Sequence, residues 1–236
     1  MNFGKNILTH GSMITSPELK PSVILISASI VLAMHRDLAP LGMASVSVLP
    51  GFSLDAVQVM FVTAFLLMGV LPVILTRSVF HDRLANYGVR LGDWKTGLLS
   101  IAVLYPLIAA LLLYPASQTA DMRAFYPLDK SATTLSSLLS FELLRIIFFY
   151  TAWEFFFRGF MLFGLRERFG DWTAICIQTI PSCLWHIGYP SGELFSSIAG
   201  GLLFGILAIR TRSIVWAWIL HVLIGVTLDV CIIITN

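Results

Sequence analysis

The stretch LSSLLSFELLRIIFFYTAWEFFFRGFMLFGL, residues 135–165, is a long apolar run that carries charged side chains inside it. A helix needs about 20 mostly apolar residues to cross a bilayer, because each residue adds about 1.5 Å. A charge at the bilayer centre costs at least about 2.5 kcal/mol, so ionisable residues in such a run indicate a functional site or a buried pair. The stretch therefore predicts a membrane-spanning helix and marks where a site would lie.

The composition of the whole chain supports a membrane protein. Of its 236 residues, 57% are hydrophobic and 12% are charged, and the mean hydropathy is +0.86. Soluble domains carry roughly 25% charged residues, and folding a chain of this size hides only about 70 to 75% of its surface. A water-soluble globule is therefore excluded. The net charge of +2 is too small to indicate a nucleic-acid partner, and the expected partner is the lipid bilayer.

Seven apolar runs predict an all-α, polytopic transmembrane bundle of about seven helices. The first run, residues 22–34, is weak because His35, Arg36 and Asp37 interrupt it, so we expect a short or broken helix there. The polar stretch 115–134 is expected to be an external loop that separates amino-terminal helices, residues 1–134 and not separately folded, from a helical core at residues 135–236. The clear runs are residues 57–76, 97–114, 135–165, 172–187, 194–209 and 213–235.

The basic residues between the runs predict the orientation, because cytoplasmic loops retain Lys and Arg. A short segment precedes the first run, which fits a bacterial or archaeal cell membrane. With seven spans the amino terminus is expected to be cytoplasmic and the carboxyl terminus external. One side carries Lys5, Lys20, Arg77, Arg83, Arg90, Lys95, Arg166, Arg168, Arg210 and Arg212, and the other carries Arg36, Arg123 and Lys130.

Five ionisable residues fall within spans of the carboxyl-terminal half: Glu154, Arg158, His186, His221 and Asp229. At about 1.5 Å per residue, Glu154, His186 and His221 lie about 16, 21 and 12 Å from the cytoplasmic ends of their runs. A carboxylate and two imidazoles near one depth can activate water and polarise a carbonyl group, as amide hydrolysis requires. These three residues are our candidate catalytic group.

Structural roles remain open for the same residues. Glu154 and Arg158 are four residues apart on one helix face, so they can pair in a buried salt bridge that only holds two helices together. A single histidine on an apolar face is also a common core residue. Asp229, on the same stripe as His221 and Gly225, either orients His221 through a water or lies at the interface near the helix end.

The motif around Glu154 resembles a known family. Residues 153–159, WEFFFRG, are similar to the E-E-x-x-x-R-G motif of the CPBP family, also called Abi, whose intramembrane proteases include the type II CAAX prenyl endopeptidases. Residues 201–207 and the helix leading to His221 resemble the family's G-L-L-F-G segment and last histidine helix. His186 falls where the family has its F-x-x-x-H histidine. The likeness covers about residues 137–230.

The resemblance implies roles for the candidate residues. Glu154 and His186 would be the base and its partner, His221 the oxyanion donor, and Arg158 the clamp on the glutamate. It also implies that residues 135–236 are a catalytic core, and that the substrate is a membrane-associated protein or peptide.

Three positions depart from the family pattern and bear on activity. The motif's first glutamate is Trp153, the phenylalanine of the second motif is Ser182, and the asparagine four residues after the last histidine is Gly225. One hypothesis is an intramembrane endopeptidase. The alternative is a catalytically inactive protein of the same fold with an immunity or partner-binding role, and a proton-coupled carrier ranks last because no inverted repeat is evident.

No cofactor and no metal are expected. One glutamate and two histidines are also a zinc ligand set, so zinc at Glu154, His186 and His221 is the alternative. The chain lacks an H-E-x-x-H sequence and has no paired C-x-x-C spacing.

Overall fold

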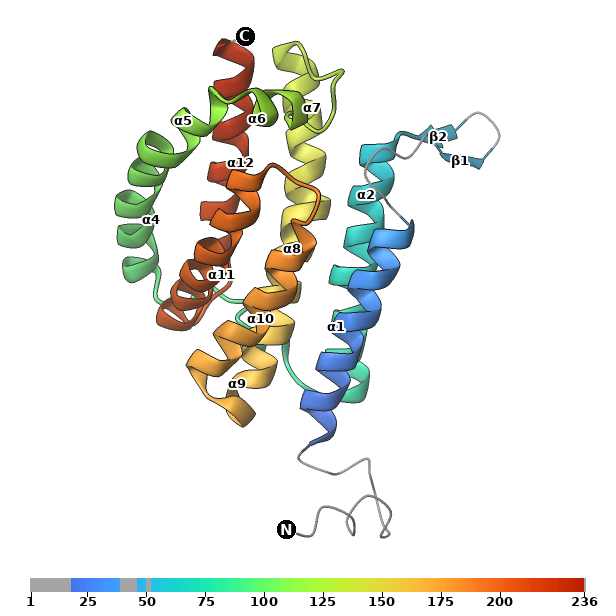
Figure 1. The fold of residues 1–236 in the computed structure, drawn as a ribbon. Helices are drawn as coiled ribbons and strands as arrows, with labels where there is room; N and C mark the ends of the chain where they lie inside the picture. Colours follow the sequence, from blue (N-terminus) through green and yellow to red (C-terminus); the bar gives the residue numbers. More distant parts are fainter. Residues whose placement is uncertain (1–17, 39–45, 50–51, 236) are drawn as a thin grey trace.

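The computed structural model describes residues 18–38, 46–49 and 52–235, which form a bundle of long helices (Figure 1). A short antiparallel hairpin, β1 (Val46–Leu49) and β2 (Phe52–Leu54), lies beside it. The helical segments include π-helical stretches (η2, η3, η5, η6, η7) and a 3-10 turn (η4). They are α1 (Leu19–Leu38), α2 (Ala56–Ala64), η2 (Phe65–Val70), α3 (Leu71–Ile74), η3 (Leu75–Val79), η4 (Leu84–Tyr87), α4 (Trp94–Ile108), η5 (Ala109–Leu113), α5 (Tyr114–Ser117), α6 (Ala120–Phe125), α7 (Leu135–Leu144), η6 (Arg145–Tyr150), α8 (Thr151–Glu154), η7 (Phe155–Phe163), α9 (Gly164–Phe169), α10 (Asp171–Trp185), α11 (Ser191–Thr211) and α12 (Val215–Thr235).

Within the described residues, six helices are long and apolar enough to cross a membrane. This confirms the all-α, polytopic fold and a multi-pass integral membrane protein. The six candidate spans are Leu19–Leu38, Ala56–Val79, Trp94–Ser117, Ser136–Phe169, Ser191–Thr211 and Val215–Thr235.

The seventh expected span is the short helix α10. It has 15 residues and is therefore about 22 Å long, less than the roughly 30 Å of a hydrocarbon core. The helix ends at Trp185 with His186 as its C-cap, and a turn through Gly188, whose φ is +99°, leads to α11. The short length of α10 thus sets the depth at which His186 lies.

The first helix differs from expectation. Instead of a short or broken element, α1 is unbroken over 20 residues and includes His35 and Arg36. These polar side chains bind neighbours and do not interrupt the helix. His35 Nε2 lies 3.1 Å from the carbonyl oxygen of Met60, and Arg36 donates to the carbonyl of Ile187 at 3.3 Å.

The run that opened the sequence analysis forms the central helix, Ser136–Phe169. In the most apolar 18 residues of this helix, 78% of the residues are buried, whereas 11% are buried in the corresponding stretch of the span Trp94–Ser117. That span lies at the outer side of the bundle (Figure 1). Helices α1, α10, α11 and α12 all contact the central helix. Every residue from 152 to 165 is buried, whereas Leu139, Leu143 and Ile147 are exposed along one face nearer the start of the helix. The charged residues of the buried half, Glu154 and Arg158, therefore meet protein rather than lipid.

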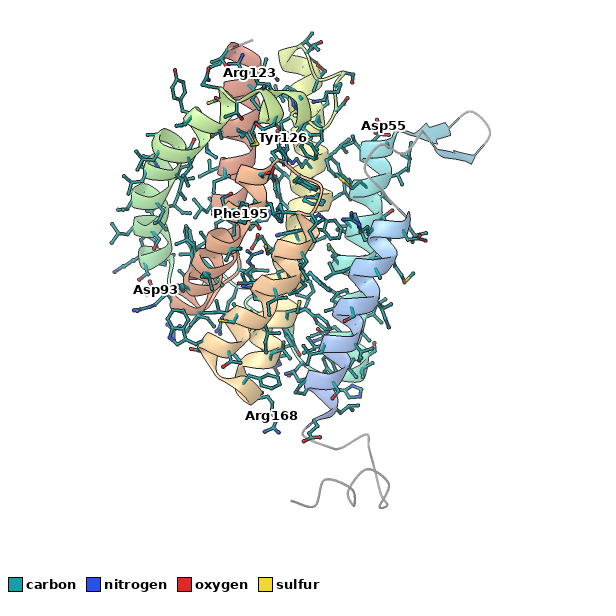
Figure 2. The ribbon with its side chains drawn as sticks, viewed as in Figure 1. Asp55, Asp93, Arg123, Tyr126, Arg168 and Phe195 are labelled. Carbon is teal, nitrogen blue, oxygen red and sulfur yellow. The ribbon has the colours of Figure 1, made fainter. Side chains whose placement is uncertain are left out.

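The expected external loop at residues 115–134 is partly helical and packs on the bundle. It contains α6, from which Met122 and the adjoining Tyr126 lie buried against Leu228 and Ile232 of α12. Apolar side chains in this polar stretch explain the difference, because they have a surface on α12 to cover. Tyr126 lies toward the end of the bundle where α12 ends (Figure 2).

The predicted division of basic residues agrees with the arrangement of the helix ends. Arg168 lies at one end of the bundle and Arg123 at the other (Figure 2), and Lys20 pairs with Asp82 at 2.8 Å at the end where α1 begins. Lys5 lies outside the described residues. That the end with Lys20 and Arg168 faces the cytoplasm, and that the membrane is prokaryotic, remain predictions, as does the division of the chain at residue 134.

Candidate active site

Glu154 and His221 are in direct contact although they are distant in sequence. Glu154 ends α8 on the central helix, and His221 lies in the second turn of α12. The Nδ1 atom of His221 is 2.7 Å from Oε1 of Glu154, which is fully buried. A carboxylate only accepts hydrogen bonds, so Nδ1 donates and the opposite ring nitrogen, Nε2, is left free for other partners.

Arg158 lies one helical turn beyond Glu154, as the sequence spacing predicts. Its Nη1 is 3.4 Å from Oε1 of Glu154, and its guanidinium group lies over the ring of Phe204 at 5.1 Å. Arg158 is 2% exposed, so the pair is shielded from solvent. Arg158 therefore balances the charge of Glu154 and holds the carboxylate beside α12.

His186 is positioned by the end of its helix. Its Nδ1 lies 2.8 Å from the carbonyl oxygen of Ser182, one turn earlier in α10. Because a carbonyl oxygen only accepts, Nδ1 carries the proton and Nε2 of the neutral ring is an acceptor. Ser182, which stands where the family has phenylalanine, thus fixes the imidazole through its backbone.

Trp153 contacts both imidazoles. Its ring centroid is 5.7 Å from that of His186 and 6.2 Å from that of His221, and it also packs on Trp185 at 5.5 Å. The indole is 2% exposed. A tryptophan at this motif position therefore takes up the volume next to the histidines and supplies no carboxylate.

The two histidines face one small cavity of about 40 Å³. This volume accommodates about two or three water molecules. The described residues of its wall do not include Glu154, which reaches the cavity only through His221. The wall is formed by Tyr126, Leu128, Arg145, Phe149, Tyr150, Trp153, Trp185, His186, Tyr189, Glu193 and His221.

The geometry agrees with the result of sequence comparison. Residues 135–227 match the family of proteins described as type II CAAX prenyl endopeptidase, Rce1-like. We call this stretch the Rce1-like region. The match confirms the CPBP resemblance and supports a CAAX protease-type function. Comparison with curated proteins and with solved structures gave no match to the chain.

The Rce1-like region brings a further carboxylate to the cavity that the sequence analysis missed. Glu193, in the first turn of α11, accepts a hydrogen bond from the Tyr126 hydroxyl at 2.7 Å, and its Oε1 lies 3.8 Å from Nε2 of His186. The sequence does contain a signal for this residue: Glu193 is acidic and follows His186 by seven positions. It lies just before the apolar run 194–209, so it was not counted as a residue inside a span. We call Glu154, His186, Glu193 and His221 the histidine cluster.

The structure gives Asp229 a direct partner that neither expected role named. It is fully buried, and its Oδ2 accepts a hydrogen bond from Nη1 of Arg145 at 2.7 Å. Asp229 lies two helical turns, about 12 Å, beyond His221, whose Nδ1 is already bound by Glu154. Arg145 also lies 3.5 Å from Glu142, so we call Glu142, Arg145 and Asp229 the arginine cluster.

Gly225 has a steric role in the Rce1-like region. A Cβ atom at this position would overlap the hydroxyl oxygen of Tyr150. The phenol ring also lies 4.6 Å from the ring of His221. Where the family pattern has asparagine, this chain therefore has a glycine whose space is filled by a tyrosine from the central helix.

Outside the spans, the chemistry of the cavity wall includes Tyr126 and Tyr189. Burial raises the pKa of Tyr126, and Glu193 raises it further. Burial and Glu193 likewise raise the pKa of Tyr189 to about 12. Both phenols are therefore protonated donors at neutral pH.

Among the described residues, no group of three or more His, Cys, Asp and Glu side chains is arranged to hold a metal ion. The zinc alternative at Glu154, His186 and His221 would require His221 to release Glu154 or to bind metal through Nε2.

Proposed function

We propose that this chain is an intramembrane endopeptidase that hydrolyses a peptide bond of a membrane-associated protein or peptide. The observation that carries the proposal is the convergence of His186 and His221, from separate helices, on one cavity of a size suited to water, with Glu154 bound to His221. Hydrolysis within a membrane needs a protected place for water and a group that accepts its proton.

The contacts favour a different pairing from the one implied by the motif. Glu154 binds His221 and does not line the cavity, so we assign it to orienting that imidazole and stabilising its protonated form. His221 then presents Nε2 toward the reacting groups. His186, with its Nδ1 proton held by Ser182, presents a second basic nitrogen.

A wider apolar cavity supports a substrate with an apolar segment. It has a volume of about 660 Å³, lies between α1 and α10, and shares Trp185 and Tyr189 with the small cavity. Side chains such as Leu32, Leu184 and Ile187 form its wall. We assign this space to the apolar part of the substrate next to the scissile bond.

The test is turnover by the purified chain in lipid vesicles. The reporters are a farnesylated peptide ending in a CAAX sequence and a transmembrane peptide without a lipid group. Glu154→Gln, His186→Gln and His221→Gln are each expected to lower kcat about 10³-fold, because each removes a proton-transfer or orienting group. The matched control is Glu142→Gln, a buried carboxylate on the same central helix that does not line the cavity.

Wild-type turnover that survives all three replacements would refute the assignment of the site. Turnover measured in the same vesicles after treatment with a zinc chelator tests the alternative in which a zinc ion is required. We expect unchanged turnover for the reaction proposed, whereas loss on chelation and recovery with zinc would support the metal site.

A second candidate function is a non-catalytic partner-binding or immunity role. Its specific support is Trp153, which occupies the place of the motif's first glutamate, together with the fully buried Glu154 and Arg158 pair. In that case no reporter is cleaved, and Glu154→Gln lowers thermal stability without changing the phenotype.

A further inference from the structure

We propose that Glu193 is a catalytic carboxylate of this site and that it forms an acid–base pair with His186. The proposal rests on the proposed function. It assigns to α11 a charge that the family motif would place at position 153 of the central helix. Nothing in the motif pattern points to Glu193, whereas the geometry of the cavity does.

The position of Glu193 is defined by two neighbours. Its Oε1 accepts the Tyr126 hydroxyl at 2.7 Å and lies 3.8 Å from Nε2 of His186. Its other oxygen, Oε2, is buried and has no hydrogen-bond partner among the described residues. A buried acceptor without a bond is costly, so its place in the wall of a water-sized cavity suits the binding of water.

The protonation state of His186 makes the pair productive. Because Nδ1 donates to the carbonyl of Ser182, both Nε2 and the Glu193 carboxylate are acceptors. Two acceptors 3.8 Å apart can share one water molecule, with one hydrogen directed to each. The water oxygen is then left with its lone pairs free to attack.

The proposed step conserves atoms and charge. The water oxygen forms a bond to the carbonyl carbon of the scissile amide, the π electrons move to the carbonyl oxygen, and one water proton passes to Nε2 of His186. The resulting imidazolium donates to the Glu193 carboxylate, which stabilises it. That proton then passes to the amide nitrogen as the carbon–nitrogen bond breaks and the carbonyl re-forms, giving a carboxylic acid and an amine.

Two features stabilise negative charge on Glu193 against the cost of its burial. The residue lies in the first turn of a helix of 21 residues, where the helix dipole favours negative charge. Arg145 lines the same cavity and lies over the ring of Tyr126 at 5.8 Å, so a positive charge is also nearby. Trp153 contacts His186 on its ring without competing for its proton.

The experiment compares Glu193→Gln with Tyr126→Phe in the vesicle assay, using the reporter that the wild type cleaves. Glutamine keeps an acceptor for Tyr126 but has no charge, so Glu193→Gln is expected to lower kcat at least about 10²-fold with KM within about twofold. Tyr126→Phe removes the bond that joins α6 to α11 and keeps the carboxylate, so kcat is expected to fall less than about tenfold. Glu193→Asp, which withdraws the carboxylate by one methylene, should give an intermediate loss.

Each outcome decides the question. If Glu193→Gln is folded and fully active while His221→Gln is inactive, the Glu193 proposal is overturned and the proposed function stands. An equal loss in Tyr126→Phe and Glu193→Gln would show that Glu193 only fastens the helices. If Glu193→Gln does not fold, full activity in folded Glu193→Asp would overturn the proposal, and an inactive wild type would overturn it together with the proposed function.

Discussion

The histidine cluster and the arginine cluster are two buried polar groups centred on the same helix, yet their chemistry differs. Glu154 and Arg145 are nine residues apart, about 14 Å along the axis. In the arginine cluster, Arg145 meets two carboxylates and is held at 2.7 Å by Asp229. In the histidine cluster, His186 and His221 each have Nδ1 in a hydrogen bond, and Nε2 of each has no hydrogen bond to a described residue.

This difference shows what separates a site from a structural ion pair in the membrane. Both clusters contain ionisable groups that are costly to bury singly, so burial alone does not indicate catalysis. Arg145 is always charged and cannot exchange a proton near neutral pH, whereas imidazoles can. A cavity lined by free imidazole nitrogens is therefore suited to proton transfer, and the arginine cluster to holding α12 against the central helix.

The largest effect on stability is expected from breaking the arginine cluster. Asp229→Asn leaves Arg145 with the more distant Glu142, and we expect the free energy of unfolding in mixed micelles to fall by about 3 to 5 kcal/mol. The kcat per folded molecule should change less than about tenfold, because Asp229 does not line the cavity and Arg145, which does, keeps its charge.

The matched control removes both charges of the pair. Arg145→Met with Asp229→Leu leaves no unpaired charge, so its loss of stability should be smaller than that of Asp229→Asn. If Asp229→Asn kept full stability and lost turnover, the division between the two clusters would be wrong.

The second prediction tests the close contact of Gly225 with Tyr150, which lies between the two clusters. In Gly225→Ala, the new methyl group would overlap the Tyr150 hydroxyl, and overpacking of a buried contact costs about 1 to 3 kcal/mol. Tyr150 packs on His221, so kcat should fall as well. Thermal unfolding and turnover are measured for Gly225→Ala, Tyr150→Phe and the double variant.

The double variant should recover part of both losses, because phenylalanine removes the overlapping oxygen. Additive effects of the two substitutions would contradict a direct contact between these positions.

Much of the fold was predictable, because a membrane-spanning helix can be recognised from the length and composition of an apolar run. The apolar runs predicted the spans, and the long run at 135–165 proved to be the buried central helix. The unbroken α1 was not predictable, because the polar residues at its end bind partners distant in sequence, such as Met60 and Ile187. The packing of residues 115–134 on α12 likewise depends on tertiary contacts.

The site was predictable in part. Depth arithmetic selected His186 and His221, which share one cavity, and it placed Glu154 near them. Depth does not specify which side of a helix faces which neighbour, so the pairing of Glu154 with His221 and the partner of Asp229 required coordinates. Glu193 lies before an apolar run, where position along the chain does not indicate that it turns toward the histidines.

The smallest effect is expected from a partly exposed ion pair between Lys20, at the start of the first span, and Asp82. Asp82 follows the span Ala56–Val79, and its carboxylate accepts hydrogen bonds from Lys20 at 2.8 Å and from Tyr87 at 3.1 Å. Partial burial favours the neutral acid, but the hydrogen bond and charge of Lys20 outweigh it, so the pKa of Asp82 lies below its ordinary value. A partly exposed pair of this kind contributes less than about 1 kcal/mol, in contrast to the buried arginine cluster.

The sign of the pH dependence follows from the lowered pKa. Asp82 binds its proton less readily in the folded state, so its contribution to stability is complete above the unfolded pKa of about 3.9 and is lost as the pH falls through the folded value. The thermal midpoint of Asp82→Asn should therefore lie slightly below that of the wild type at pH 7, and the gap should narrow as the pH falls below about 4. High salt at pH 7 should narrow the same gap, because partly exposed charges are screened. A gap that stays constant from pH 7 to pH 3 would mean that Asp82 stabilises the fold through packing rather than charge. The difference in stability between this partly exposed pair and the buried arginine cluster could then not be attributed to the screening of charge by solvent.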